Sequence, residues 1–221
     1  MIAVVDYCKG NLKSVERGLR SVGGDARIVD DPARIAEASA IVLPGVGAFA
    51  DASDSMMRAG QMQAVRDAVE RGVPFLGICL GLHLMFEEGT EGSPEEDDDV
   101  STHNAPGLAI LPGVAGRMPS HDELGRHYKV PHVGWNSIER TPECDTPLLD
   151  GIDDGEFFYF THSYIAPENS ATQATTTHSI AFPSVVDYNH TAFGVQFHPE
   201  KSSDAGLHVL KNFLSIVDGA C

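Results

Sequence analysis

One short stretch constrains the fold more than any other: a cysteine, Cys79, flanked by Gly77 and Gly81. The apolar run before it, residues 73–78, has the length and composition of a buried strand. The apolar-rich residues after it, through Phe86, are of helical length. Glycine is expected at both flanks because a side chain there would collide with the neighbouring strand or helix, and because the turn needs unusual backbone angles. The pattern predicts a cysteine version of the nucleophile elbow, a strand-to-helix turn that presents one side chain above a sheet.

Two interpretations of Cys79 remain open on the elbow alone. A thiol at a helix N-terminus is favoured as the thiolate, the form that attacks carbonyl groups. The alternative is a buried cysteine that only packs, and the elbow favours the nucleophile. The other three cysteines, Cys8, Cys144 and Cys221, have no ligand-like spacing, so neither a zinc site nor a disulfide framework is indicated, and we expect no metal or other cofactor.

Charge excludes some classes of partner. The net charge of −17 argues against nucleic acid and anionic membranes as partners, since both need basic surface. No apolar run approaches the length that spans a bilayer, and residues 1–6 resemble a first strand rather than a signal peptide. Together with the cysteine usage, these features predict a cytoplasmic location. The acidic run at residues 95–99 could in principle bind metal, but we interpret residues 87–106 as an acidic surface loop.

Strand-like and helical segments alternate through the first half of the chain. Strands are expected at 2–5, 26–29, 40–43 and 73–78, with helical spacing of apolar residues at 12–22 and 62–69. This order predicts an α/β fold with a doubly wound, mostly parallel sheet flanked by helices. Ligands of such sheets bind beyond the carboxyl ends of the strands, where residues 7–11, 44–49 and the elbow should converge.

The second half predicts more antiparallel pairing. Short strand-like runs occur at 109–111, 127–130, 156–165, 179–182 and 192–197, and a closing helix is expected at 203–217. We interpret residues 1–221 as a single domain with an antiparallel-rich second half.

A second chemical cluster is Gln196-Phe197-His198-Pro199-Glu200. Pro199 disfavours a helix at His198, and in an extended chain positions i and i+2 project to the same side. The Glu200 carboxylate can therefore orient the His198 imidazole toward a nucleophile, as in hydrolytic triads. His-Pro-Glu alone is more often an ordinary turn, but with a cysteine elbow upstream it favours a triad.

Segments along nearly the whole chain resemble the class I, triad-type glutamine amidotransferases, whose fold is flavodoxin-like. The elbow and His-Pro-Glu are shared by all members. Asp6-Tyr7 with Gly10-Asn11-Leu12 and Pro44-Gly45-Val46-Gly47 also carry the resemblance. The segments Pro131-His132-Val133-Gly134-Trp135-Asn136 and Phe160-Thr161-His162-Ser163-Tyr164 point in particular to the branch that serves histidine biosynthesis.

The resemblance implies a glutaminase that converts L-glutamine to glutamate and ammonia. Cys79 would attack the side-chain amide and form a thioester, His198 would carry the proton, and Glu200 would hold His198. The backbone N–H groups of Leu80 and Val46 would form the oxyanion hole. Gly45 and Gly47 leave the Val46 peptide free to rotate, so we predict that it switches between inactive and active orientations. Without the elbow, Pro-Gly-Val-Gly would be interpreted as a plain turn.

The resemblance also implies a heterodimer. Members of this branch pass ammonia to a separate cyclase subunit with a (β/α)8 barrel, which makes imidazole glycerol phosphate and the aminoimidazole carboxamide ribotide. No Gly-rich phosphate loop follows a strand in this sequence, which supports a separate partner chain. By resemblance, the partner interface would include Asn11, Trp135, Asn136 and Lys201. Trp135 could equally be a core residue.

One position departs from the family pattern. The family usually has glutamine four residues after the nucleophile, and here that residue is His83. Histidine would make the substrate contact pH-dependent, or His83 could be a packed helix residue. Glu91, Ser163 and Tyr164 are the other substrate-binding residues that the resemblance implies. Two rivals are another class I glutaminase subunit, such as that of pyridoxal phosphate synthase, and an inactive relative, which would have no reason to keep Cys79, His198 and Glu200.

Overall fold

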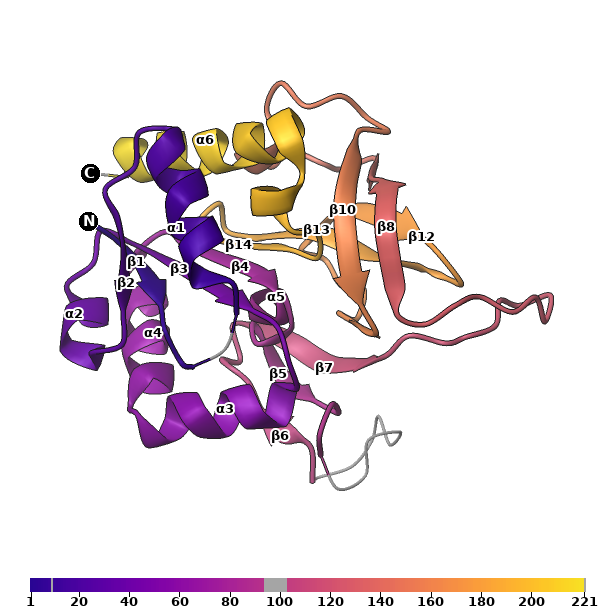
Figure 1. Ribbon diagram of the computed structural model, residues 1–221, viewed down its shortest axis with the longest axis horizontal. Coiled ribbons are helices and arrows are strands. Elements are labelled where there is room, and N and C mark those ends of the chain that lie inside the picture. The colour runs from indigo at the N-terminus through magenta and orange to yellow at the C-terminus, as the bar shows by residue number, and fades with distance from the viewer. Residues whose placement is uncertain (9, 94–102, 221) are drawn as a thin grey trace.

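The computed structural model describes residues 1–8, 10–93 and 103–220. Its largest sheet has eight strands in the order β2-β1-β3-β4-β14-β13-β12-β9 (Figure 1). The first five strands in this order are mutually parallel, and β13, β12 and β9 are added antiparallel. Their bounds are β1 Ile2–Val5, β2 Ala26–Val29, β3 Ala40–Gly45, β4 Phe75–Cys79, β9 Glu139–Arg140, β12 Thr172–Thr177, β13 Ala181–Tyr188 and β14 Ala192–Val195. The predicted α/β class, with its antiparallel-rich second half, is confirmed.

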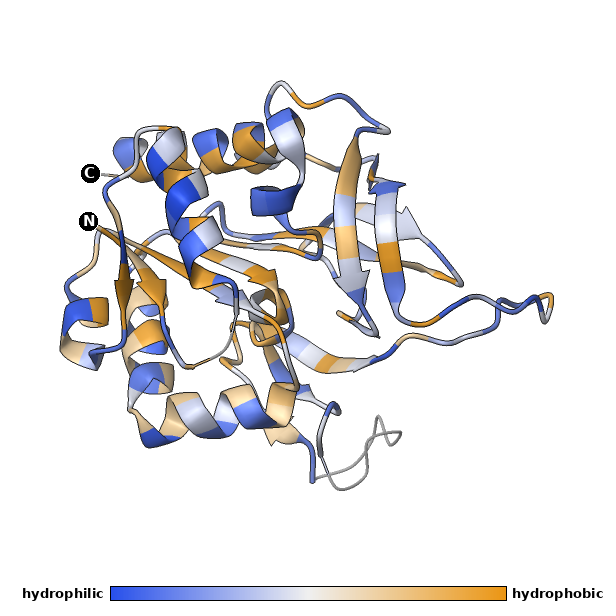
Figure 2. Cartoon of the chain, viewed as in Figure 1, coloured by the Kyte–Doolittle hydropathy of each residue, from blue (hydrophilic) through white to orange (hydrophobic). Residues whose placement is uncertain are grey.

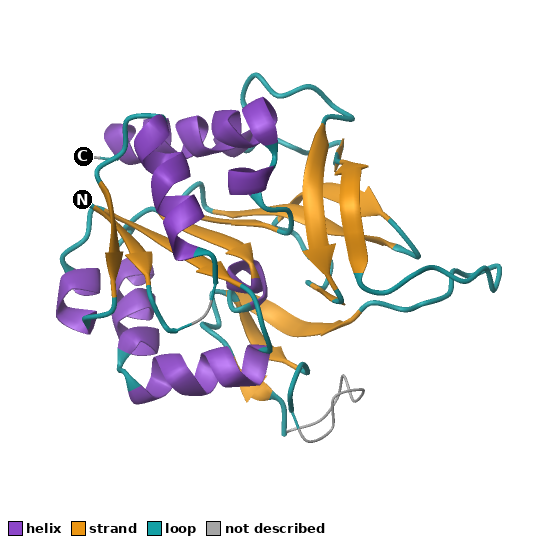
Figure 3. Ribbon diagram, viewed as in Figure 1, coloured by secondary structure: helices purple, strands orange, loops and turns teal. Residues whose placement is uncertain are grey.

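Helices cover both faces of this sheet because its strands are apolar on both sides. Successive side chains of a strand point to opposite faces, so Val4 and Val5 of β1 belong to different buried clusters. On one face lie α1 (Leu12–Ser21) and α6 (Ser203–Gly219), and on the other lie α2 (Pro32–Ala36), α3 (Phe49–Arg58) and α4 (Gln61–Glu70) (Figures 1 and 3). Figure 2 shows the resulting division, with apolar residues along the central strands and polar ones on the outer helix faces.

Two smaller sheets extend the molecule beyond the main one. β8 (His132–Ser137) pairs antiparallel with β10 (Phe157–His162), and a four-stranded sheet has the order β11-β7-β5-β6. The bounds of its strands are β5 Phe86–Gly89, β6 Ala105–Pro106, β7 Leu111–Arg117 and β11 Tyr164–Ile165. The remaining elements are the 3-10 turns η1 (Pro147–Leu149) and η2 (Pro199–Lys201) and the helix α5 (Leu80–His83). The strand expected at 127–130 is not formed: β8 begins two residues later, at His132.

Two expectations around the elbow are wrong. The helix predicted through Phe86 is the single turn α5, because Phe86 begins β5 and pairs with Leu111 of β7. A continuous apolar run does not distinguish a buried helix from a buried strand. The surface loop predicted at 87–106 is likewise strand at both ends, in β5 and β6, and Thr90 within it is buried. The acidic run at 95–99 lies outside the described residues.

Among the described residues, no helix combines the length and the apolar character needed to cross a bilayer.

Candidate active site

The elbow has the strained geometry that its sequence predicts. Cys79 ends β4 with φ 54° and ψ −105°, a conformation that residues with a side chain rarely adopt. A Cβ atom on Gly77 would collide with the carbonyl of Gly81 in the following turn, and one on Gly81 would overlap the carbonyl oxygen of Leu43 in β3. Both glycines are therefore required for α5 to turn back tightly over the sheet.

Sheet topology brings the second cluster to the elbow. β14 lies parallel to β4, with Val195 opposite Ile78, so Cys79 at the end of β4 and the segment after β14 lie at the same carboxyl edge of the sheet. The His198 Nδ1 and Glu200 Oε1 atoms are 3.0 Å apart, and both side chains are almost fully buried. Burial lowers the pKa of His198, but its interactions with Cys79 and Glu200 outweigh burial and raise that pKa to about 9. The structure thus brings Cys79, His198 and Glu200 together.

The His198 Nε2 atom is the one that faces the thiol. It is buried and has no hydrogen-bond partner among the described residues, yet the Cys79 sulfur is near enough to raise the pKa of His198. Nδ1 is occupied by Glu200, which fixes the orientation of the ring. The imidazole is therefore placed to exchange a proton with the Cys79 sulfur.

The predicted oxyanion segment lies directly beside the nucleophile. Gly45 of β3 is the register partner of Cys79, and Val46, 40% exposed, follows it at the surface. The Tyr7 hydroxyl donates a 2.8 Å hydrogen bond to the carbonyl oxygen of Pro44. A Cβ on Gly45 would overlap that hydroxyl, so Tyr7 and Gly45 are in close contact and hold the end of β3.

A cavity of about 230 Å³ opens over Cys79. All four residues predicted to bind substrate line it, together with three of the four predicted for the oxyanion hole. The lining residues are Val46, Gly47, Cys79, Leu80, His83, Glu91, Pro131, Thr161, His162, Ser163 and Tyr164. Gly45, the remaining residue of the predicted oxyanion hole, is buried beneath them.

One lining residue, His162, is bonded to a second neutral histidine, His132, outside the cavity lining. The His162 Nδ1 atom lies 2.9 Å from the carbonyl oxygen of Tyr164 and donates to it, since a carbonyl can only accept. Its Nε2 atom lies 3.1 Å from Nδ1 of His132 and accepts from it. Burial lowers the pKa of His132 to about 4 and that of His162 well below its ordinary value, so both rings are neutral at pH 7.

The His83 side chain is hydrogen-bonded to Gln196, a partner that the sequence did not suggest. Its Nε2 atom lies 2.8 Å from Oε1 of Gln196, and burial lowers the pKa of His83 to about 4. The pH dependence that we expected for a substrate contact by His83 therefore falls well below neutrality. Gln196 itself was not predicted as a site residue. The available signal was its position two residues before His198 in an extended segment, which puts both side chains on one side.

The four predicted interface residues occupy different environments. Asn11 is exposed at the start of α1. Trp135 is 51% exposed on β8, so it is not a core residue. Its indole packs edge-on against the Tyr159 ring, over which the Lys201 ammonium also lies, 5.9 Å from the ring centroid. Asn136 instead turns inward, where its amide nitrogen lies 2.9 Å from the Thr177 carbonyl oxygen and 3.3 Å from Nε2 of His132.

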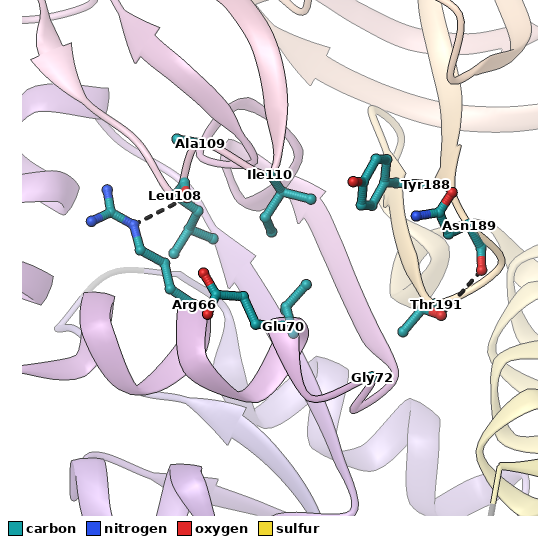
Figure 4. A pocket seen from close by; sticks show the side chains of 10 residues that line it. Arg66, Glu70, Gly72, Leu108, Ala109, Ile110, Tyr188, Asn189 and Thr191 are labelled. Carbon is teal, nitrogen blue, oxygen red and sulfur yellow. Dashed lines mark hydrogen bonds between the residues drawn. The ribbon is translucent and has the colours of Figure 1, made fainter.

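A larger cavity, of about 420 Å³, lies at the amino ends of β4 and β14, at the opposite edge of the sheet (Figure 4). None of the predicted site residues lines it, and Arg66 beside it is bonded to the carbonyl oxygens of Gly107 and Leu108. Within the described part of the chain, no group of three His, Cys, Asp or Glu side chains is arranged to hold a metal ion.

A cysteine elbow beside a buried His–Glu pair, at the carboxyl edge of a doubly wound sheet, defines a triad-type amide hydrolase. The family model "Glutamine amidotransferase class-I" matches residues 3–217. Among curated relatives, the imidazole glycerol phosphate synthase subunit HisH of Syntrophotalea carbinolica is 44% identical over 96% of this chain and 98% of its own length. The subunit of the same name from Salinibacter ruber is 43% identical over 98% and 94%. The chain therefore belongs to the class I glutamine amidotransferases, in the family of these HisH subunits.

Solved structures agree on the fold. A crystal structure described as a glutamine amidotransferase superimposes with a TM-score of 0.71 at 19% identity, covering 99% of this chain and all of its own. The structure of PurLQS from Thermotoga maritima gives a TM-score of 0.67 at 17% identity, over 99% of this chain and 97% of that one. At these identities the likeness concerns the fold alone. The resemblance drawn from the sequence is confirmed by the family match and by the curated relatives.

Proposed function

We propose that the protein hydrolyses the side-chain amide of L-glutamine with Cys79, His198 and Glu200, as the glutaminase subunit of an imidazole glycerol phosphate synthase in histidine biosynthesis. The observation that carries this proposal is the placement of Cys79 beside a buried His198–Glu200 pair. Cys79 is more than a hundred positions before the His198–Glu200 pair in the chain, and they meet because β14 is inserted next to β4.

The first chemical step is attack of the Cys79 sulfur on the amide carbon of glutamine. The raised pKa of His198 means that this imidazole takes the thiol proton readily and keeps it as imidazolium. The tetrahedral intermediate collapses as the C–N bond breaks, and the imidazolium gives its proton to the leaving ammonia. A thioester remains on Cys79, and water activated by His198 then releases glutamate and restores the thiol.

Glu200 acts through His198. Its carboxylate accepts a hydrogen bond from Nδ1, so that Nε2 faces the sulfur and the positive charge of the imidazolium is stabilised. Because both side chains are buried, this interaction is little screened by solvent.

Charge on the amide oxygen develops next to the segment that follows β3. Backbone N–H groups of Val46 and Leu80 are the proposed donors, and both residues line the cavity with Cys79. Gly47, with φ 111°, lets the chain turn sharply after Val46. Val46 is exposed rather than packed, which supports the expectation that its peptide reorients during activation.

The cavity suits a small amino acid with one charge of each sign. Glu91 lines it, and its carboxylate would attract the ammonium group of glutamine. Tyr164, the first residue of β11, Ser163 just before it, and His83 of α5 also line the cavity. These four residues are the proposed substrate-binding set.

The family name denotes a subunit, so the protein works with a partner chain. The proposed partner is a cyclase subunit with a (β/α)8 barrel. The surface that supports docking is the outer face of β8 and β10, where Val133, Trp135 and Phe157 are each more than half exposed. Exposed apolar side chains grouped in this way are typical of an interaction site. The same two strands carry Thr161 and His162 of the cavity wall, so the docking face adjoins the site of ammonia release.

Glutamate release, measured with and without a cyclase subunit and its ribonucleotide ligand, tests this proposal. We expect release in the complex and little or none from the isolated subunit. Absence of glutamate release from the complete, liganded complex would rule out the glutaminase function.

A further inference from the structure

The carboxamide of Gln196 lies between the nucleophile and His83. Its Nε2 atom is 3.7 Å from the Cys79 sulfur, and its Oε1 atom is 2.8 Å from Nε2 of His83. Gln196 is completely buried and His83 is 3% exposed. The three side chains come from different elements: β4 ends at Cys79, α5 ends at His83, and Gln196 directly follows β14.

The orientation of the Gln196 amide depends on which ring nitrogen of His83 carries the proton. An amide oxygen can only accept, so Nε2 of His83 carries the proton and donates it to Gln196. The low pKa of His83 keeps that ring neutral over the working pH range, with one N–H to donate. The other tautomer of His83 would allow the amide to be turned around, but the amide oxygen would then face the sulfur and repel a thiolate. The observed orientation therefore aims an N–H at the nucleophile.

We propose that Gln196 is a positioning residue that donates a hydrogen bond to the Cys79 sulfur, and that His83 fixes the amide of Gln196 in the orientation this requires. The inference rests on the proposed function and deepens it. It also assigns His83 a task other than the substrate contact expected at its position.

A donor is needed here because the elbow helix supplies less stabilisation than the sequence led us to expect. The helix macrodipole sums the dipoles of successive peptides, and α5 has only four residues. A buried thiolate without a donor is costly, and a hydrogen bond to a charged group is stronger than one between neutral groups.

The other groups around the sulfur do not replace Gln196. The titratable side chains that line the cavity with Cys79 or interact with it are His198, Tyr7, His83, His162, Tyr164 and Glu91. The Tyr7 hydroxyl donates to Pro44, and the Nδ1 proton of His162 goes to Tyr164. The Thr161 carbonyl, 4.0 Å from the sulfur, can only accept. Among the described side chains, Gln196 is the one that donates a hydrogen bond to the sulfur, while His198, the triad base, exchanges a proton with it.

Gln196→Leu removes the donor while keeping an apolar side chain of similar reach. We expect Cys79 to be alkylated by iodoacetamide about tenfold more slowly at neutral pH, which is the loss expected for one hydrogen bond to a charged sulfur. The pH profile of alkylation should move to higher pH. In the complex, kcat should fall with little change in KM, because Gln196 does not line the substrate cavity. The alkylated peptide is identified by mass spectrometry, since Cys8 and Cys144 are also free.

The orientation step is tested at His83. His83→Gln keeps an N–H that can donate to Gln196, whereas His83→Leu does not. We expect His83→Leu to slow alkylation several-fold and His83→Gln to recover most of that loss. Adding His83→Leu to Gln196→Leu should slow alkylation no further, because the pair acts through one hydrogen bond. Gln173→Leu is the matched control, a buried glutamine bonded to the Asp145 amide, and should not change the rate.

Each result separates this inference from the proposed function. Equal alkylation rates for Gln196→Leu and wild type would overturn it, as would equal rates for His83→Leu and His83→Gln. Circular dichroism and thermal unfolding establish that each variant is folded, and if Gln196→Leu does not fold, the two His83 variants decide. Retention of glutamate release by Cys79→Ala would instead overturn the proposed function.

Discussion

The His198 Nδ1 atom lies 3.0 Å from Oε1 of Glu200, and both side chains are almost fully buried. Interaction with Glu200 is one of the causes that raise the pKa of His198 to about 9. His198 must be in its protonated, imidazolium form to give a proton to the leaving ammonia. Glutaminase activity should therefore fall as pH rises through about 9. In Glu200→Gln this alkaline limb should shift to lower pH. Initial rates of glutamate release across neutral and alkaline pH check it, and a limb at the same pH in both proteins would contradict it.

The same pair should make stability depend on pH. The folded-state pKa of His198, about 9, lies above its ordinary value of 6.5. Its contribution to stability is therefore fully present below pH 6.5 and is lost as pH rises through about 9. We expect the difference in free energy of unfolding between wild type and Glu200→Gln to be largest near pH 6 and to shrink toward pH 9. Urea denaturation at several pH values measures it, and a constant difference would contradict the linkage.

Replacement of the nucleophile separates its chemistry from assembly. Cys79→Ala removes the sulfur without adding bulk at the strained elbow. We expect glutamine-dependent synthesis by the complex to be lost, while synthesis from added ammonium salt is retained, because the proposed cyclase partner takes its nitrogen from ammonia and not from glutamine itself. Product formation from each nitrogen source is the measurement. Loss of both activities together would indicate a structural task for Cys79.

The hydrogen bond from Tyr7 to Pro44 anchors the proposed oxyanion segment. It is buried and 2.8 Å long, and its removal in Tyr7→Phe leaves the Pro44 carbonyl without this donor. We expect the free energy of unfolding to fall by about 1–2 kcal/mol. Tyr188→Phe is the control, because Tyr188 is 41% exposed and its hydroxyl can bond to water. Urea denaturation of both variants compares them, and equal stabilities would show that the hydrogen bond contributes nothing.

The central chemistry could be predicted from sequence because it depends on residue types at short spacings. The glycines flanking Cys79 and the spacing of His198 and Glu200 each imply a local geometry. That Cys79 lies beside His198 in space could not be derived from hydrophobic periodicity, because it depends on the insertion of β14 beside β4. That adjacency was supplied by the resemblance to a family.

Elements without strong apolar periodicity were missed. β12, with the sequence TQATTT, is mostly buried although it is rich in threonine, whose hydroxyl groups find partners such as the Ser137 carbonyl for Thr176. α3 was also missed, because its buried face is made of small residues such as Ala52 and Ser53 as well as Met56. Gln196 was overlooked for a related reason: a single polar residue at the end of an apolar strand becomes informative only when its neighbours in space are known.

The exposed face of β8 and β10 gives the prediction most directly concerned with the partner. The Trp135 indole is 51% exposed and is held by the Tyr159 ring rather than by the core. Large aromatic side chains at the centre of an interface often dominate its binding energy. We therefore expect Trp135→Ala to weaken binding of the cyclase subunit by about 2 kcal/mol, or roughly thirtyfold in Kd.

The free energy of unfolding of the isolated subunit should change by less than about 0.5 kcal/mol, because the half-exposed Trp135 side chain contributes little to the core. Met57→Ala is the matched control, since Met57 is 47% exposed on α3 and lies apart from the β8–β10 face. Isothermal titration calorimetry gives the Kd values, and thermal unfolding gives the stability. Unchanged affinity in Trp135→Ala would place the docking surface elsewhere on the molecule. A large loss of stability would instead mean that Trp135 supports β8 itself, and the affinity change could then not be assigned to the interface.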